Sequence, residues 1–592
     1  MRLTRTRLMA GSLVAALGLA GCGGGSGQDT SAAGQPQRGG TLKLVGSSDV
    51  DHLDTVDAYY TVTNIVLRAF TRQLVTYPAS NNKDERSTVV ADLATEVPSQ
   101  ANGGITDGGK TYTFHLRPGV NWDTTPPRPV TAQDVVLGMK RLCNPVRPVP
   151  APGYYENTIV GFQDYCEAFL KAPGTLAGIS DFISSHDIAG VQATNDSTVV
   201  FRLRSPASDF INIMTLPFAS PTPEEYLKYL PDSPELRTHT ISDGPYRITS
   251  YEPNKEIDLA RNPNWDAGAD PLRKAYVDRI TVTQGMDTTA VQQQLEAGTA
   301  DMEWDTNVPP PSLPGLMASK DPRLVLTGAG TTNPYLAINF LSPNANRATS
   351  KLKVRQALEY AVNKKSVIQV LGGPKLGPAL DTFLTPEING YEQFNLYPTK
   401  DHQGDPAKAK QLLTEAGYPD GVELKLLYPT GGDGPKIAQT LQADLARSNI
   451  TTTLVPTTQS DFYANFLQVP SVARRGVWDI AIPGWVPDWP GNAARSFIVP
   501  VLDGRTFAPG STNYGDFNDP EVNKAIDQAL STPDANEAAK FWHQADRRAM
   551  EQAAVVPIRE AKLPVFHASR VQNFQILPLS TQGDITNVWL SS

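Results

Sequence analysis

Short segments that alternate apolar and polar residues recur along the chain and predict β-strands. Successive side chains of a strand point to opposite faces, so alternation gives one apolar face that can cover a core. Four such segments are clear: 41–45, 112–116, 199–203 and 422–426.

Other segments repeat apolar residues at helical spacing, with recognisable starts and stops. Thr131 and Asp134 form a capping-box pattern, and Asp405-Pro406 and Asp519-Pro520 each place an N-cap aspartate before an N1 proline. Two longer stripes begin near Val354 and Asn536, and we expect them to end near Gly372-Gly373-Pro374 and at Pro557. Because strands and helices interleave throughout, the predicted fold class is α/β, arranged in lobes.

Length and charge narrow the possible classes of protein. The chain has 592 residues, of which 40% are hydrophobic and 19% charged, enough apolar material for more than one core. Its formal charge is −9, and a mature chain without the three arginines of the first 21 residues would be near −12. A nucleic-acid partner would need a basic patch, so we expect none.

The N-terminus has the pattern of an export signal. Arg2, Arg5 and Arg7 precede the apolar run 8–20, which is too short to span a bilayer. The run leads into Leu19-Ala20-Gly21-Cys22, which resembles the bacterial lipobox, and a Gly- and Ser-rich stretch follows. We therefore expect a lipoprotein signal peptide at 1–21, lipidation of Cys22 and a flexible tether at 22–37. The alternative is a simple signal peptide in which Cys22 has no role.

Export changes the interpretation of the two remaining cysteines. In an oxidising compartment, Cys143 and Cys166 are expected to form a disulfide rather than a metal or redox site, and no metal ligand set is predicted. Two buried thiols are the alternative.

The order of short sequence blocks resembles the extracytoplasmic solute-binding proteins, family 5, which serve peptide and nickel ABC transporters. The oligopeptide- and dipeptide-binding type is the nearest in pattern. Each block is only a strand, a turn or a helix start, so their order and spacing carry the resemblance. The blocks are Gly-Gly-Thr-Leu at 39–42, then 74–77, 92–94, 109–120, 130–136, 244–247, 261–265, 295–301, 335–339, 354–358 and 407–418.

This resemblance implies a periplasmic-binding-protein-like two-lobed clamp, type II, with an extra inserted domain. Lobe I would comprise 38–78, 221–330 and 556–592; the inserted domain 79–220; and lobe II 331–555. The implied role is capture of short peptides outside the cell for an ABC permease and its ATPase subunits. The protein would be a monomer, held at the outer face of the membrane by its lipid anchor, without a cofactor.

The resemblance also suggests where a peptide would lie. Peptide binders of this family carry a Gly-Trp-x-x-Asp segment whose aspartate pairs with the peptide's N-terminal ammonium, and here it gives Gly484, Trp485 and Asp488. Gly484 would let another backbone approach closely. Trp485 and Trp489 are candidates for side-chain pockets, and Tyr335 and Asn339 for contacts at the hinge.

Each of these residues also has a structural interpretation. Asp488 is also typical of an aspartate in a turn, the tryptophans of core residues, and Tyr335 and Asn339 of strand packing. Some oligopeptide binders have an arginine two positions before the glycine, where it can meet the peptide's carboxylate. This chain has Ile482 there, so the partner of that carboxylate stays unidentified.

The sequence fits other functions less well than peptide capture or leaves them open. A secreted hydrolase is disfavoured because no Gly-x-Ser-x-Gly, His-Glu-x-x-His or phosphate-loop motif occurs and the seven histidines are scattered. The same fold could bind a metal chelate, a sugar or a signalling peptide, and the sequence leaves these alternatives open.

Overall fold

The computed structural model describes residues 35–458, 461–578 and 582–591. The predicted signal peptide and Cys22 lie outside the described residues. Residues Gln37–Ser592 form one compact unit. In the described part of the chain, no helix combines the length and the apolar character needed to cross a bilayer.

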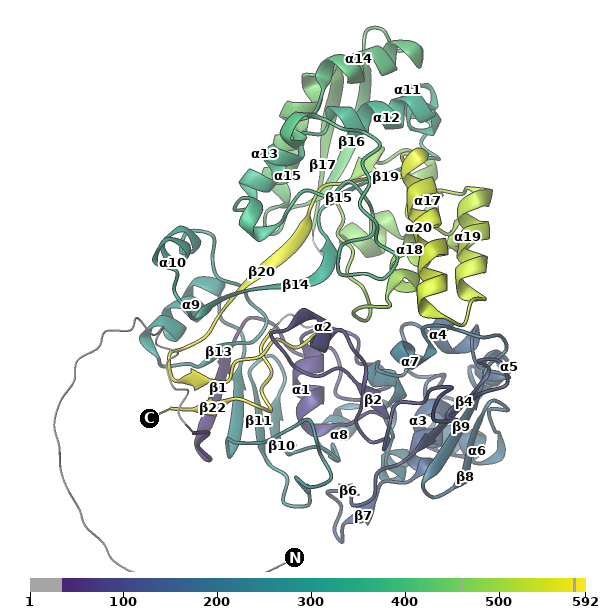
Figure 1. Cartoon of the computed structure of the whole chain (residues 1–592), viewed down its shortest axis with the longest axis vertical. Helices are drawn as coiled ribbons and strands as arrows, with labels where there is room; N and C mark the ends of the chain where they lie inside the picture. Colours follow the sequence, from purple (N-terminus) through teal and green to yellow (C-terminus); the bar gives the residue numbers. More distant parts are fainter. Residues whose placement is uncertain (1–34, 459–460, 579–581, 592) are drawn as a thin grey trace, which may run out of the picture. The chain divides into compact units, whose positions relative to one another are not determined.

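The first five-stranded sheet has the order β10-β11-β12-β1-β13 (Figure 1). β1 pairs in parallel with β12 and β13, whereas β10, β11 and β12 pair antiparallel. Leu42 of β1 and Ile280 of β12 share a buried apolar cluster with Ile65 of α1. The elements of this region are β1 (Thr41–Val45), α1 (Thr63–Phe70), β10 (Tyr246–Glu252), β11 (Glu256–Arg261), β12 (Arg279–Thr283), α9 (Thr288–Ala297), β13 (Met302–Glu303) and α10 (Leu313–Ser319).

The second five-stranded sheet has the order β17-β16-β18-β15-β19. β16 is parallel to β17 and β18, and β15 is antiparallel to β18 and β19. Its elements are β15 (Tyr335–Ile338), α12 (Leu352–Ala361), α13 (Lys364–Val370), α14 (Pro406–Glu415), β16 (Val422–Pro429), α15 (Gly434–Ala446), β17 (Ile450–Thr457), β18 (Ile480–Ala481) and β19 (Val555–Pro557).

A third sheet of four antiparallel strands has the order β4-β5-β9-β8. Its buried cluster is continuous with the helices α18, α19 and α20 and includes Phe114, Phe201, Phe497 and Trp542. The elements are β4 (Ile105–Thr106), β5 (Thr111–His115), α3 (Ala132–Arg141), α4 (Gly153–Glu156), α5 (Phe162–Phe169), α6 (Leu176–Ser185), β8 (Val191–Asn195), β9 (Thr198–Arg202), α18 (Ala494–Leu502), α19 (Pro520–Leu530) and α20 (Ala535–Glu551).

A two-stranded ribbon of β14 (Leu324–Thr332) and β20 (Glu560–Phe566) runs between the first two sheets (Figure 1). The strands of the first, second and third sheets fall within the segments predicted for lobe I, lobe II and the inserted domain, respectively. The exception is β19, which crosses the predicted boundary at 555. The division into lobes stays a prediction, since Gln37–Ser592 form one unit. The shorter elements are β2 (Val75–Thr76), α2 (Lys83–Arg86), β3 (Val90–Ala91), β6 (Asn121–Trp122), β7 (Arg128–Pro129), α7 (Phe210–Ile213), α8 (Pro234–Arg237), α11 (Asn344–Arg347), α17 (Pro470–Arg474), β21 (Val571–Gln572) and β22 (Trp589–Leu590).

Local capping signals located the helix starts well. α3 has the predicted capping box between Thr131 and Asp134. The side chain of Asp405 accepts a hydrogen bond from the Lys408 N–H, and Asp519 caps α19 in the same way. These predictions are confirmed because a cap depends on residues within one turn.

Two predicted helix ends and one predicted strand face are wrong. α12 ends at Ala361, and Asn363 caps a separate helix, α13. α20 ends at Glu551, because Ala553 adopts a left-handed conformation (φ 45°) and Val555 and Val556 pair with β15. β9 is buried on both faces and not on one, because α3 packs against it.

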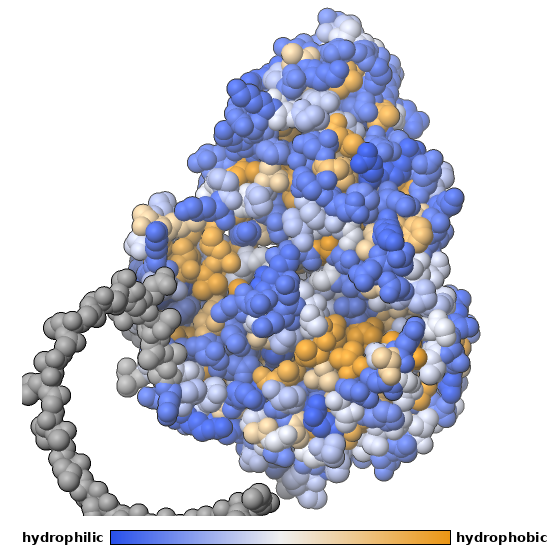
Figure 2. Space-filling view, in the orientation of Figure 1, coloured by the Kyte–Doolittle hydropathy of each residue, from blue (hydrophilic) through white to orange (hydrophobic). Residues whose placement is uncertain are grey.

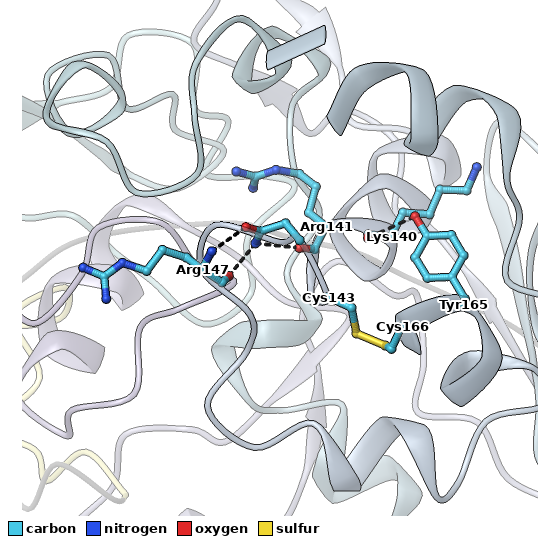
Figure 3. Close-up of a disulfide and its surroundings, with 7 residues drawn as sticks. Lys140, Arg141, Cys143, Arg147, Tyr165 and Cys166 are labelled. Carbon is cyan, nitrogen blue, oxygen red and sulfur yellow. Dashed lines mark hydrogen bonds between the residues drawn. A yellow bond between two sulfur atoms is a disulfide. The ribbon is translucent and has the colours of Figure 1, made fainter. Parts of the chain in front are cut away.

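Cys143 and Cys166 are joined by a disulfide, with their Cα atoms 5.0 Å apart (Figure 3). Cys143 lies two residues after the end of α3, and Cys166 lies in α5. Tyr165, beside Cys166, donates a hydrogen bond from its hydroxyl to the backbone oxygen of Lys140 at 3.2 Å. Both the disulfide and this bond therefore fix α5 against the end of α3.

Replacing both cysteines with serine is expected to lower the free energy of unfolding by about 3 kcal/mol, because the bridge restricts the unfolded chain across a separation of 23 residues. Chemical denaturation of the two proteins would measure the difference. Reductant should destabilise the wild type by a similar amount and leave the double serine variant unchanged. Equal stability of wild type and variant without reductant would contradict the prediction.

Candidate functional site

A cavity of about 710 Å³ is the candidate ligand site. It is lined by segments far apart in the sequence: residues 58–64 before and at the start of α1, residues 304–305 after β13, and residues 484–488 between β18 and α18. Its size is typical of small-molecule and peptide sites. Apolar residues gather in several patches on the face in Figure 2, so exposed apolar surface alone does not mark a site. At this cavity, however, Tyr59, Tyr60 and Val486 are all at least 40% exposed.

The Gly484–Asp488 segment is held in place at both ends. Trp485 exchanges two backbone hydrogen bonds with Thr332 at the end of β14, at 2.9 and 3.0 Å. The Trp485 ring nitrogen donates to the Ser496 backbone oxygen at 2.9 Å, and the Asp488 N–H to the Ser496 hydroxyl at 3.2 Å. The segment is therefore fixed to both the ribbon and α18, so the Asp488 side chain has a defined position.

Gly484 lies where a side chain would collide. A Cβ atom there would come within 2.7 Å of the Asn333 side chain, and the Gly484 N–H donates to the Tyr463 hydroxyl at 3.3 Å. The glycine thus permits the close approach of two chain segments at the cavity wall.

The Asp488 carboxylate accepts hydrogen bonds from two tyrosine hydroxyls. Tyr59 donates at 2.8 Å, and Tyr154 of α4 donates to the other carboxylate oxygen. Among the described residues, no lysine, arginine or histidine nitrogen lies within 4 Å of it; Arg495 stacks over the Tyr154 ring and pairs with Asp209. Burial raises the pKa of Asp488, against the lowering effect of the two hydroxyls. The site thus holds a carboxylate with hydrogen-bond donors but without a counter-cation.

The other acid of the cavity wall has a structural role. Asp305 accepts hydrogen bonds from the backbone N–H groups of Ser47 and Ser48 at 2.7 and 2.8 Å and from both serine hydroxyls. Asp305 and Asp488 are the charged residues of the described lining, and the rest is aromatic, apolar or neutral polar. The cavity therefore favours a ligand group that carries positive charge.

The predicted site residues divide into two groups. Gly484, Trp485 and Asp488 line the cavity together. Trp489 is fully buried and packs edge-on against Tyr154 at 5.1 Å between ring centroids, so it supports the site from behind.

Tyr335 and Asn339 are fully buried and do not belong to the described lining. The Asn339 side-chain amide donates to the backbone oxygens of Ala473 and Trp478, both at 2.8 Å. The packing interpretation therefore fits these two residues better than contact with a ligand. Sequence reasoning missed Tyr59 and Tyr154, whose only local signal is an aromatic residue outside a predicted strand.

The described lining of this cavity contains no histidine or cysteine, and its two carboxylates, Asp305 and Asp488, do not belong to a close group of three potential metal ligands. The close group of potential metal ligands in the described residues is Cys143, Glu156 and Cys166, and its two cysteines form the disulfide.

Comparison with known proteins identifies the family. The model of the bacterial extracellular solute-binding proteins, family 5, matches residues 88–498. Heme-binding protein A of Haemophilus influenzae is 29% identical over 77% of this chain and 77% of its own length. Di/tripeptide-binding protein 1 of Pseudomonas aeruginosa is 27% identical over 80% and 82%.

A solved structure extends the likeness to the fold. The clavulanic acid biosynthesis oligopeptide binding protein 2 has a TM-score of 0.84 and 27% identity, and the match covers 95% of this chain and 97% of that one. The predicted two-lobed α/β clamp class is thereby confirmed. The chain belongs to the bacterial extracellular solute-binding proteins of family 5.

Proposed function

We propose that this protein captures short peptides outside the cell and delivers them to the permease of an ABC importer, without covalent chemistry of its own. The observation that carries the proposal is the Asp488 carboxylate, which faces a cavity of about 710 Å³ and has two hydroxyl donors but no counter-cation among the described residues. A peptide's N-terminal ammonium supplies the missing positive charge and further hydrogen-bond donors.

Peptide capture also explains the other lining groups. Aromatic side chains such as Trp485 and Tyr514 offer apolar surface to ligand side chains of different shapes. Recognition through the ligand's terminal charge is independent of its side chains, so the binding would tolerate many peptide sequences. The named relatives that bind di- and tripeptides or oligopeptides support this choice of ligand class.

The positions of the Asp488 partners support closure of the clamp around a ligand. Asp488 belongs to predicted lobe II, Tyr59 to predicted lobe I, and Tyr154 to the predicted inserted domain. A ligand at Asp488 would touch all three segments and so favour the conformation in which they lie together. The closed form would dock on the permease, whose ATPase subunits drive import. Lipidation at Cys22 would keep the monomeric protein at the outer membrane face.

Native mass spectrometry of the protein purified from its own host would test the ligand class. Short peptides released on denaturation, with one narrow range of lengths, are the expected result. A haem, a metal chelate, a sugar or a single defined peptide would retain the binding role and replace general peptide capture by a more specific one.

Acetylation of the peptide's N-terminus is expected to weaken binding by about tenfold to a hundredfold. It removes the charge that pairs with Asp488, although protonation of this carboxyl limits the cost of leaving it unpaired. Isothermal titration calorimetry with a released peptide and its N-acetyl form would measure the ratio. Equal affinities would contradict the role given to Asp488.

A further inference from the structure

A second cavity, of about 360 Å³, adjoins the first one. The two cavities share Tyr463 and Gly484 in their walls. The second is lined further by residues 431–434 at the start of α15, by Ile482 and by Arg559, which directly precedes the strand β20. Tyr463 and Gly484 therefore form a wall common to both cavities, and a ligand that extends past Gly484 would reach both.

Arg559 brings a positive charge to the second cavity. Its Nε donates to the Asn333 backbone oxygen at 2.8 Å and one terminal nitrogen to the Leu376 oxygen at 3.4 Å. Among the described residues, no carboxylate oxygen lies within 4 Å of its guanidinium. Burial lowers the pKa of Arg559 to about 10, so it stays charged at neutral pH. Arg559 is half-buried, and a cation held only by neutral carbonyls can accept an anionic partner.

The other charged residue of the described lining of this cavity does not form an ion pair with Arg559. Asp433 lines the cavity and its charge favours the protonated form of Arg559, but its carboxylate lies more than 4 Å from the guanidinium and pairs with Lys436 at 3.0 Å. It is also the N-cap residue of α15, and its side chain makes no capping hydrogen bond. The positive end of the helix dipole therefore adds to the field of Arg559.

The two cavities differ in charge. Asp488 and Asp305 are the charged residues of the described lining of the first cavity, whereas Arg559 is the unpaired ion of the second. A short peptide has the same polarity, with an ammonium group at one end and a carboxylate at the other. Laid past Gly484, it would match each end with an opposite charge.

We propose that the second cavity is a carboxylate subsite in which Arg559 binds the C-terminal carboxylate of a peptide whose ammonium lies at Asp488. This inference rests on the proposed peptide function and assigns to Arg559 the role that the sequence left without a residue. It also limits ligand length, because both termini must reach their partners across Gly484.

The test uses alanine peptides, from dipeptide to pentapeptide, each as the free acid and as the C-terminal amide. Calorimetry would compare wild type with Arg559→Gln, Arg559→Lys and a control, Arg475→Gln, which alters an exposed arginine away from both cavities. We expect wild type and the control to bind the acid of at least one length about thirtyfold more tightly than its amide. Arg559→Gln should bring the two forms to equal affinity, and Arg559→Lys should keep part of the preference.

The outcomes separate the two proposals. Peptide binding in which wild type does not distinguish acid from amide, or in which Arg559→Gln keeps the full preference, would overturn the subsite and leave peptide capture intact. If wild type bound none of the peptides in either form, peptide capture would fall and the subsite with it. The acid–amide comparison in wild type still decides the question if Arg559→Gln does not fold, which thermal unfolding would reveal.

Discussion

Replacing Asp488 with asparagine is expected to weaken the binding of a short peptide with a free N-terminus by about 2–5 kcal/mol. The variant keeps an oxygen that can accept from Tyr59 or Tyr154, so the cavity wall should keep its shape. It removes the negative charge that the ligand's ammonium would meet in a partly desolvated site, where a charge pair is strong. Calorimetry on both proteins with a peptide released from the wild type would measure the loss.

The same substitution should not destabilise the ligand-free protein at neutral pH. Burial raises the pKa of Asp488 above its unfolded value, so the folded state binds its proton more tightly than the unfolded state does. Stability from this group is present at low pH and declines as the pH rises from the unfolded pKa through the folded one. Asparagine removes the cost of burying a charged carboxylate, so the denaturation midpoint at neutral pH should be equal or higher in the variant.

The contributions of Asp488 to peptide binding and to stability therefore depend on pH in opposite directions. Peptide affinity of the wild type should fall as the pH drops through the raised pKa, because the protonated carboxyl no longer attracts the ammonium. The variant should lack this dependence. Asp420→Asn, which alters an exposed aspartate outside the described lining of both cavities, is the control for charge alone and should behave as wild type. Peptide affinity of Asp488→Asn equal to that of wild type would contradict the assigned role.

The sequence was most informative where structure depends on near neighbours. The segment 41–45 became β1, and the caps at Thr131, Asp405 and Asp519 lie where their patterns predicted. The ends of α12 and α20 were missed because they depend on competition between continuing a helix and starting a second helix or pairing with β15, which is a tertiary effect.

The candidate site could be predicted only in part, for a related reason. The Gly-Trp-x-x-Asp segment is contiguous, so its resemblance to peptide binders could be read directly. The partners of Asp488 are 429 residues away at Tyr59 and 334 away at Tyr154, and nothing in their local sequence indicates the contact. Arg559 likewise lines the second cavity only because strand β20 of the ribbon brings the C-terminal part of the chain back beside Asn333.

One buried ion network joins segments that the sequence placed in lobe I and in the inserted domain. Asp92 is fully buried; its carboxylate accepts from Arg72 at 2.8 Å and from two nitrogens of Arg273 at 2.8 and 3.0 Å. Both arginines are 1% exposed, and Asp270 lies beside Arg273 at 3.3 Å. Burial alone would raise the pKa of Asp92, but the charges of Arg273 and Arg72 hold it far below the usual range.

Replacing Asp92 with asparagine is therefore expected to lower the free energy of unfolding by about 3–5 kcal/mol, because two buried guanidinium groups lose the carboxylate that accepts hydrogen bonds from both and keep only Asp270 as a nearby anion. For an acid whose folded pKa is depressed, the stabilisation is present above the unfolded pKa, near 4, and is lost as the pH falls toward the folded one. The variant should consequently lose less stability than wild type on acidification. Chemical denaturation at neutral and acidic pH, with Asp420→Asn as the control, would measure both effects, and a parallel loss in wild type and variant would contradict the second.

Since Asp92 is not in the described lining of either cavity, the variant that still folds should retain peptide affinity, in contrast to Asp488→Asn, which should lose affinity and retain stability.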